Sequence, residues 1–444
     1  MIEICTVGGF DEVGRNMSAV RVDNEVVILD MGIFLDKYIP FTAQVEEGLP
    51  LNPEQLIREG AVPDINLIAD WKKMVKAIIP SHAHLDHIGA IPYLADRFKA
   101  PIICTKYTAE VIKAIASDQK MRIGNRIKIL NPNSRIKLTD QIEVEFIQAT
   151  HSILQAVMIA LHTKYGTIVY TNDFKFDNTP VMGKKPNYKM LREIGKKGVL
   201  AVFMDSLYSG EMRKTPSEAV AREMLKEVML GTETEGKLVI VTTFASHMAR
   251  IKSILDFGQQ MRRKIVFLGR SLSKYITAAE NINLVDFSKK GELVRYSIKA
   301  RQKLKEVDRK GRHKYLLVVT GHQGEPGSML QRIASGKLGF KMGYEDLVIF
   351  SSAVIPTDIN RKNRDDLERA LRSKGVRIFR DIHVSGHGAR EDERDLINML
   401  KPKYIIPSHG PREHVKYAAA LAVEMGYKRE QVKFSNNGKR FKLS

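Results

Sequence analysis

The sequence has little of what marks secreted, membrane or disulfide-rich proteins. Its two cysteines, Cys5 and Cys104, exclude a disulfide framework and a Cys-rich zinc module. No apolar run approaches the about 18–20 residues that a membrane span needs, and the N-terminus shows no secretory signal. Hydrophobic residues make up 43% of the chain, which is enough for a buried core and excludes wholesale disorder. We therefore expect a soluble cytoplasmic protein with no membrane partner and more than one structural module.

Acidic residues are scarce relative to basic ones. The 444 residues include 71 Lys and Arg against 51 Asp and Glu, a formal net charge of +20. Residues 206–380 hold 34 Lys and Arg against 19 Asp and Glu, so this segment carries +15 and the rest only +5. Any single basic run, such as 309–314, is most simply a solvated helix face. The asymmetry between segments nevertheless favours a module that binds an anion, with nucleic acid as the first candidate.

The predicted secondary structure changes along the chain. The first part consists mainly of β-rich segments with tight turns, a long irregular connection over 36–73 and a predicted helix over Ile88–Phe98. From about residue 217, helices alternate with apolar strands, as in Pro216–Leu230 followed by Leu238–Thr242. This alternation predicts a parallel α/β module. After this module, the chain returns to the pattern of its first part. The sequence shows no internal repeat and no low-complexity tract.

Histidine is rare, with twelve residues, but three histidines lie in one short segment. His82, His84, Asp86 and His87 form an HxHxDH pattern directly after a predicted strand at Val75–Ile79. Four potential ligands within six residues at a strand end can reach two adjacent metal ions. Imidazole and carboxylate ligands suit Zn²⁺ or Mn²⁺. A lone histidine is more often a plain surface or core residue, whereas this cluster predicts a metal site.

Other candidate ligands also follow predicted strands. His151, Asp173 and His409 each lie just past a strand end, where an open sheet builds its sites. Singly, each would more often be an ordinary loop residue, but the HxHxDH cluster favours a metal role, and a carboxylate such as Asp173 can bridge two cations. Asp30 also ends a strand, and we expect it to accept hydrogen bonds that orient the ligand loop.

In their order along the chain, these residues resemble the motifs of a known fold. Asp30, the HxHxDH run, His151 and Asp173 resemble the four motifs of the metallo-β-lactamase fold, an αββα sandwich with two metals at one edge. The resemblance implies that the fold class is α/β.

A narrower resemblance is to the β-CASP nucleases of the same superfamily. Asp205, His387 and His409 look like their three additional motifs. The basic segment lies where the parallel α/β β-CASP domain is inserted. This implies a sandwich made of 1–205 and 381–444, interrupted by a β-CASP domain at 206–380. Residues 8–17 and 320–326 look like RNase J, and the length favours the archaeal type. We expect neither the KH-like N-terminal extension of the archaeal cleavage-factor relatives nor the extra C-terminal domain common in bacterial RNase J.

The resemblance implies roles for the site residues. It implies two divalent ions, Zn²⁺ with Mn²⁺ as the alternative, and a bridging hydroxide that attacks phosphorus. By the same resemblance, His387 donates a proton to the leaving 3′ oxygen, Asp205 orients His387, and Asp86 acts in catalysis as well as in binding. A structural role remains the alternative for His387, and His383 either supports the ligands or belongs to the core. The implied metal ligands are His82, His84, Asp86, His87, His151, Asp173 and His409.

The implied substrate is single-stranded RNA, hydrolysed mainly 5′→3′ from a 5′-monophosphate end, in RNA processing and decay. Candidate RNA or phosphate contacts lie at strand ends of the inserted domain and in the loop before His387. For the serines at the strand ends, helix capping is an equally good explanation. A homodimer is expected, with RNA-decay or ribosome-associated proteins as further candidate partners. The candidate RNA contacts are Ser246, Arg270, Ser352, Ser385, Gly386 and His387.

Two positions depart from the family pattern. Asn172 stands where Gly usually precedes the bridging Asp, and Pro411 stands where Glu often follows the last His-Gly. Neither is a ligand, so we expect altered loop geometry rather than lost activity.

Several alternatives stay open at this point. The chain could be a cleavage-factor type β-CASP endoribonuclease or a DNA-directed β-CASP nuclease. A small-substrate hydrolase of the same fold has no need of the basic module or of Asp205 and His387. A non-catalytic RNA-binding scaffold is disfavoured because all seven expected ligands are present.

Overall fold

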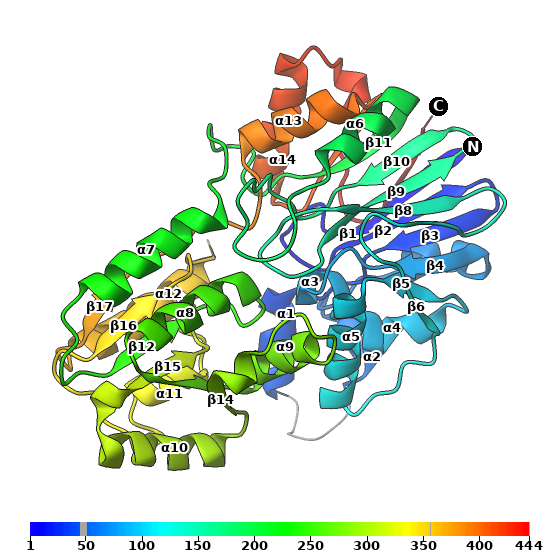
Figure 1. Cartoon of the computed structure of the whole chain (residues 1–444). Coiled ribbons are helices and arrows are strands. Elements are labelled where there is room, and N and C mark those ends of the chain that lie inside the picture. The colour runs from blue at the N-terminus through cyan, green and yellow to red at the C-terminus, as the bar shows by residue number, and fades with distance from the viewer. Residues whose placement is uncertain (45–50, 356, 444) are drawn as a thin grey trace. The chain divides into compact units, whose positions relative to one another are not determined.

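A computed structural model describes residues 1–44, 51–355 and 357–443 (Figure 1). The chain divides into two compact units. Unit 1 comprises Met1–Asn178, Gly183–Thr215 and Gly386–Ser444, and unit 2 comprises Thr179–Met182 and Pro216–Ser385. No helix in the described ranges combines the length and the apolar character that crossing a membrane requires.

Unit 1 contains two sheets that pack face to face. The first sheet is antiparallel from β19 to β3 and parallel from β3 to β6. In spatial order its strands are β19 (Lys439–Leu443), β1 (Ile2–Gly8), β2 (Met17–Val22), β3 (Glu25–Leu29), β4 (Val75–Ile79), β5 (Ile102–Cys104) and β6 (Ile127–Ile129). The second sheet contains β18 (Tyr404–Ser408), β11 (Val199–Asp205), β10 (Gly166–Tyr170), β9 (Val157–Thr163), β8 (Glu143–Gln148) and β7 (Arg135–Lys137).

Successive side chains of the strands point to opposite faces of each sheet, which explains why helices cover both outer faces. Val27 and Leu29 of β3 share one buried cluster with Phe146 of β8 and Phe203 of β11, so these side chains fill the space between the sheets. Neighbouring residues such as Val202 point the other way, towards α6 (Tyr188–Lys197), α13 (Arg390–Leu400) and α14 (Arg412–Glu424). Figure 1 shows these three helices on one side of the two sheets and α4 and α5 on the other. Unit 1 is therefore an αββα sandwich, as expected.

The remaining helices of unit 1 belong mostly to its first half. The irregular connection expected over 36–73 contains short helices, and its residues 45–50 lie outside the described ranges. These elements are α1 (Leu35–Gln44), α2 (Pro53–Arg58), η1 (Ile65–Met74), α3 (Leu85–Ile88), α4 (Ile91–Leu94), η2 (Ala95–Arg97), α5 (Lys106–Asp118) and η5 (Arg429–Gln431).

The prediction of a single helix over Ile88–Phe98 is wrong. The structure instead has α3, α4 and η2, three short pieces that end at Arg97. Gly89 caps α3, and Pro92, which has no N–H to donate, lies in the first turn of α4. Apolar spacing continued through this segment, but Gly89 and Pro92 interrupt the hydrogen-bonded backbone.

Unit 2 contains a parallel sheet flanked by helices, as the alternation predicted. All its strand pairs are parallel, and its central strands are buried along their whole length. In spatial order its strands are β14 (Gly291–Val294), β13 (Lys264–Leu268), β15 (Tyr315–Val319), β12 (Val239–Thr242), β16 (Leu347–Phe350) and β17 (Arg377–Phe379). Its helices are α7 (Glu218–Gly231), α8 (Met248–Gln260), α9 (Arg270–Glu280), η3 (Phe287–Lys289), α10 (Ser297–Lys310), η4 (Arg312–Lys314), α11 (Met329–Ala334) and α12 (Asp358–Arg372).

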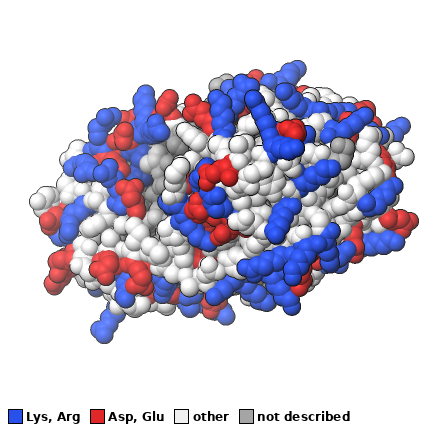
Figure 2. Space-filling view, turned by 90° about the horizontal axis from the view of Figure 1, so that it is seen from above, with Lys and Arg blue, Asp and Glu red and all other residues white. Residues whose placement is uncertain are grey.

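Many basic side chains of unit 2 already have acidic partners. Lys310 lies 2.7 Å from Glu306, and Arg312 lies 2.6 Å from Asp308 and 3.2 Å from Asp346. On the face of the whole molecule that is seen from above in Figure 2, Lys and Arg are likewise interspersed with Asp and Glu. The dense run near residue 310 is therefore partly neutralised within the unit.

Candidate metal centre

The HxHxDH segment begins at the carboxyl end of β4. His82 follows β4 by three residues and is 1% exposed. His84 has extended backbone and is the N-cap of α3, the single helical turn that carries Asp86 and His87. The short segment after β4 and the single helical turn of α3 therefore hold all four side chains close together.

A first group of ligand atoms converges around His84. Its Nδ1 lies 3.0 Å from His82 Nε2 and 3.1 Å from His151 Nε2. The same two Nε2 atoms each lie 3.6 Å from Asp173 Oδ2. Three imidazoles and one carboxylate form a donor set that suits Zn²⁺, with His84 offering Nδ1 and the other two offering Nε2.

A second group shares Asp173 with the first. His87 Nε2 lies 3.2 Å from Asp86 Oδ2 and 3.3 Å from Asp173 Oδ2. His409 Nε2 lies 3.6 Å from Asp173 Oδ1. Among the described residues Asp173 Oδ1 is buried and accepts no hydrogen bond, which fits a carboxylate that awaits a cation. The residues therefore fit two divalent ions bridged by Asp173.

Asp30 orients this site from the end of β3. Its side chain is fully buried and its φ is +59°, a left-handed conformation that Asp tolerates. Oδ1 accepts hydrogen bonds from the Ser81 N–H at 2.7 Å and from Ser81 Oγ at 2.9 Å, while Oδ2 accepts from the Tyr170 hydroxyl at 2.9 Å. Oδ2 also lies 2.8 Å from His87 Nδ1, and this bond leaves His87 Nε2 as the ligand atom.

Two asparagines to which the sequence patterns assign no role also contact the candidate ligands. Asn16 Oδ1 lies 3.0 Å from His409 Nδ1, and Asn16 Nδ2 lies 3.1 Å from His87 Nε2. The Asn172 side-chain amide donates to Ser81 Oγ and lies 2.9 Å from His82 Nδ1. The sequence signals were present, since Asn16 belongs to the segment that looks like RNase J and Asn172 precedes Asp173.

Asn172 also bears on the departure from the family pattern. Its φ is +53°, in the left-handed region that Gly adopts freely and Asn tolerates better than most residues. The other departure, Pro411, is the N-cap of α14.

Burial favours the neutral, metal-binding form of the first group. It lowers the pKa of His84 to about 4 and holds the pKa values of His82 and His151 well below the usual 6.5. At His87, burial acts in the same direction, but the carboxylates of Asp86, Asp173 and Asp30 outweigh it and raise the pKa. The first group therefore presents neutral nitrogens, and the second carries the stronger negative field.

His387 and Asp205 form a third cluster beside the ligands. His387 Nδ1 lies 2.7 Å from Asp205 Oδ2, and His387 Nε2 faces Asp173 Oδ2 at 3.9 Å. Burial opposes protonation of His387, but Asp205 and Asp173 outweigh it and raise its pKa to about 9. The pair can therefore hold a proton on Nε2, which points towards the ligand groups.

The loop before His387 is tied to the first ligand group. His151 Nδ1 lies 2.7 Å from the Gly386 carbonyl oxygen. A Cβ at Gly386 would approach Ser152 Oγ to 2.7 Å, so only Gly fits there without displacement. This gives Gly386 a structural contact besides the RNA contact expected of it.

The other candidate RNA-binding residues lie in unit 2. Arg270, Ser246 and Ser352 follow β13, β12 and β16, so they lie along the edge of the parallel sheet where the strands end. Ser246 and Ser352 are buried, whereas Arg270 is exposed at the first position of α9. His383 and Ser385 follow β17 at the same edge. His383 Nδ1 lies 3.5 Å from Arg250 Nη1 within unit 2.

Comparisons with known proteins agree with this architecture. A family model described as Metallo-beta-lactamase superfamily matches residues 11–227, and Ribonuclease J, beta-CASP domain, matches 236–365. A third, described as Zn-dependent metallo-hydrolase RNA specificity domain, matches 376–432. A crystal structure of a protein of unknown function from Enterococcus faecalis V583 has a TM-score of 0.65 at 17% identity and covers 99% of each chain, which shows a shared fold.

Close relatives extend over nearly the whole chain. The chain is 44% identical over 439 residues to Ribonuclease J of Methanocaldococcus jannaschii, covering 98% of both chains. It is 43% identical to Ribonuclease J of Pyrococcus abyssi, covering 99% of this chain and 96% of the relative. The superfamily match supports divalent metal binding. This chain therefore belongs to the ribonuclease J family, within the metallo-β-lactamase superfamily.

Proposed function

We propose that the protein is a two-metal ribonuclease that hydrolyses single-stranded RNA, mainly 5′→3′ from a 5′-monophosphate end. Family membership makes it a metal-dependent ribonuclease, and the direction and the end preference are the added part. The observation that carries the proposal is the pair of ligand groups sharing Asp173, with the His387–Asp205 pair beside them.

The ligands would be the seven predicted residues, with Zn²⁺ as the expected ion and Mn²⁺ as the alternative. His82, His84 and His151 would hold one ion, Asp86, His87 and His409 the other, and Asp173 both. When bound, two such ions activate water at neutral pH and stabilise charge on a phosphoryl group.

The protein's own groups would complete the reaction. Asp205 accepts a hydrogen bond from His387 Nδ1–H and stabilises the protonated imidazole, so His387 Nε2 can donate a proton to the leaving 3′ oxygen. Cleavage on this side of phosphorus gives a 5′-phosphate and a 3′-hydroxyl. Asp30, through Ser81 and His87, keeps the ligand loop fixed during the reaction.

Substrate binding would draw on the strand-end residues of unit 2. Ser352 Oγ is buried and has no hydrogen-bond partner among the described residues, so it is available to a phosphate oxygen. Arg270, exposed beside Gly269, can add a charge-assisted contact. The loop of Ser385, Gly386 and His387 is the proposed contact for the 5′-monophosphate. The match of 376–432 to an RNA specificity domain supports an RNA substrate.

The test uses a 5′-labelled, 5′-monophosphorylated single-stranded RNA with Mn²⁺ or Zn²⁺. We expect release of labelled mononucleotide, and slower cleavage of the same RNA carrying a 5′-hydroxyl or a 5′-triphosphate, followed as the loss of full-length RNA. Long labelled fragments alone would instead support the cleavage-factor type of endoribonuclease. Faster cleavage of DNA of the same sequence would support a DNA-directed nuclease. Light scattering of the same protein tests the expected homodimer.

A further inference from the structure

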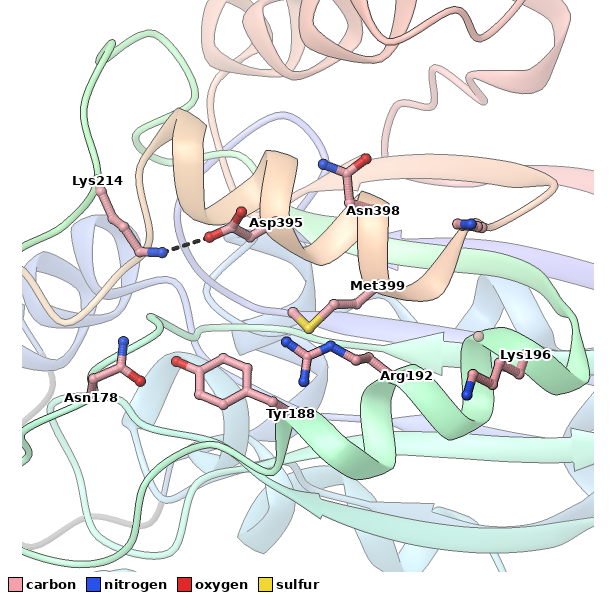
Figure 3. A pocket seen from close by; sticks show the side chains of 10 residues that line it. Asn178, Tyr188, Arg192, Lys196, Lys214, Asp395, Asn398 and Met399 are labelled. Carbon is pink, nitrogen blue, oxygen red and sulfur yellow. Dashed lines mark hydrogen bonds and ion pairs between the residues drawn. The ribbon is translucent and has the colours of Figure 1, made fainter.

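Unit 1 contains a cavity of about 770 Å³ among the helices that cover its second sheet, between α6 and α13 (Figure 3). Tyr188 and Arg192 line it from α6, and Asp395 and Met399 line it from α13. Its volume falls within the range of about 300–1,000 Å³ typical of small-ligand sites. It is separate from the ligand groups, since none of the predicted metal ligands lines it.

The lining is strongly basic. It contains Arg192, Lys196, Lys214 and Lys401 against one carboxylate, Asp395. Lys214 Nζ lies 2.6 Å from Asp395 Oδ2, the contact drawn as a dashed line in Figure 3. Within the described ranges, none of the other three cations forms an ion pair with a carboxylate. Three uncompensated positive charges therefore surround one cavity.

Helix ends explain only part of this excess. Lys196 lies in the last turn of α6, and Lys401 is the C-cap of α13, so each stabilises its helix dipole without any ligand. Arg192 lies in the middle of α6, where no such reason applies. Its guanidinium carbon lies 6.0 Å from the centre of the Tyr188 ring. An aromatic ring and a guanidinium side by side are the elements on which single-stranded nucleic acids stack and pair.

Two walls of the cavity are joined to the proposed catalytic loops. Lys214 precedes Thr215, whose hydroxyl donates to the His387 carbonyl oxygen at 2.9 Å. On the other side, Asn178 follows Asp177, whose N–H donates to the hydroxyl of Thr150, the residue before His151. The segments that line the cavity are therefore hydrogen-bonded to the loops that carry His387 and His151.

We propose that this cavity holds a nucleotide unit of the single-stranded RNA substrate, away from the bond that is cleaved. Arg192, Lys196 and Lys401 contact the phosphates, and Tyr188 with Met399 offers a flat surface for a base. The α13 wall lies within 376–432, the segment whose match supports an RNA substrate above. The inference rests on that proposed function, because it assigns the pocket to the same RNA.

The test measures RNA binding by the full chain in EDTA, where hydrolysis is blocked. The pocket variant is Arg192→Gln/Lys196→Gln/Lys401→Gln. The control, Lys184→Gln/Lys185→Gln/Lys197→Gln, removes three exposed charges near or on α6 that do not line the cavity. A labelled 20-nucleotide single-stranded RNA is titrated between 50 and 300 mM salt. We expect the pocket variant to lose about tenfold in affinity and its salt slope to fall by about 2, which corresponds to three lost phosphate contacts.

Equal losses in both variants, or none in either, would overturn the proposal. Binding of uridine monophosphate or inorganic phosphate to the cavity as tightly as RNA would also overturn it, in favour of a small-anion site. Thermal melting verifies folding, and single Arg192→Gln and Lys401→Gln variants replace the triple if it is unstable. If the parent protein shows the pocket-dependent binding but hydrolyses no RNA with Mn²⁺ or Zn²⁺, the proposed function fails and the pocket stands.

Discussion

The two units carry different kinds of residue at the ends of their strands. In unit 1 the side chains just past β4, β8, β10 and β18 are imidazoles and carboxylates, and within each ligand group their ligand atoms all lie within 4.8 Å of one another. In unit 2 the corresponding positions carry hydroxyls and Arg270. The first set suits cations and the second suits anions. A strand end is thus a general place for a site, and the residue types placed there decide which ion it attracts.

The buried charged side chains of the two units are also expected to have different roles. Unit 1 buries carboxylates and imidazoles that the proposed metals would satisfy. Unit 2 buries the Arg250 side chain completely. Its guanidinium donates hydrogen bonds to the Glu218 carboxylate at 2.6 and 2.9 Å, to the Ser351 carbonyl oxygen at 2.9 Å and to the Ile382 carbonyl oxygen at 3.1 Å. The first cluster is therefore expected to matter for activity, and the second for stability.

The largest expected effect comes from removing the shared carboxylate. Asp173→Ala takes one ligand from both groups, so hydrolysis should fall by at least about 10⁴-fold and metal content should fall from two ions per chain. Quench-flow hydrolysis and elemental analysis measure these two changes. Asp140→Ala, an exposed Asp of unit 1, is the matched control.

Replacing Asp86 and His87 by Ala should likewise abolish turnover with RNA binding retained, and unchanged turnover would contradict the two-metal assignment.

A second change separates proton transfer from metal binding. His387→Ala should slow hydrolysis by about 10²–10⁴-fold with both ions retained, because the general acid is lost and the ligands stay. Asp205→Asn should slow it less and should move the alkaline limb of the pH–rate profile to lower pH, since Asp205 helps to raise the His387 pKa. Loss of metal in either variant would instead make this pair part of the ligand set.

A third change tests the stability role of unit 2. Arg250→Met removes one of the two cationic neighbours of the buried Glu218 and leaves His247 at 3.4 Å, and the expected loss in the free energy of unfolding is about 3–5 kcal/mol. Calorimetry of the full chain measures it, with Arg309→Met, an exposed residue of α10, as the control. If the metal content also fell in Arg250→Met, the buried ion pair of unit 2 would not be independent of metal binding in unit 1.

The same ion pair predicts a pH effect. Burial opposes ionisation of Glu218, but His247 and Arg250 outweigh it and hold its pKa well below the usual 4.5. A carboxyl with a lowered pKa stabilises the fold fully above its unfolded value and less as the pH falls below about 4.5. The melting temperatures of the parent and of Glu218→Gln should therefore converge below pH 4.5. A constant difference down to pH 3 would rule this linkage out.

The smallest effect is expected from the residue behind the ligands. Asp30→Asn keeps the size of the side chain but weakens its bonds to Ser81 and His87, and metal affinity should fall about 10–100-fold. Competition with a chelator measures this loss. An unchanged affinity would mean that the ligand loop holds its shape without the Asp30 charge.

Much of the architecture followed from local pattern. The predicted strand at Val75–Ile79 matches β4 residue for residue, and the predicted strand at Leu238–Thr242 matches β12 within one residue at one end. Continuous apolar runs and short turns encode such strands locally. The helix over Ile88–Phe98 failed because apolar spacing says nothing about the hydrogen bonds that Pro92 cannot make.

The structure brings the seven predicted ligands close together, but apart from Asp30 the residues that contact and orient them could not be predicted. Asn16 reaches His409 across 393 positions of sequence, and Tyr170 reaches Asp30 across 140. No local pattern links such pairs, because they meet only when β2, β3, β10 and β18 are assembled. The same holds for Gly386, whose carbonyl contacts His151.

Residue types and three-dimensional contacts account for different features of this protein. The sequence by itself determined the HxHxDH cluster, the strand ends that carry the other ligands and the concentration of positive charge in 206–380, since each depends on residue type and local spacing. Only the tertiary structure decided which nitrogen of each histidine faces the others, which lysines and arginines already have partners, and which three surround a cavity. These depend on distances between segments far apart in the chain, and packing alone sets them.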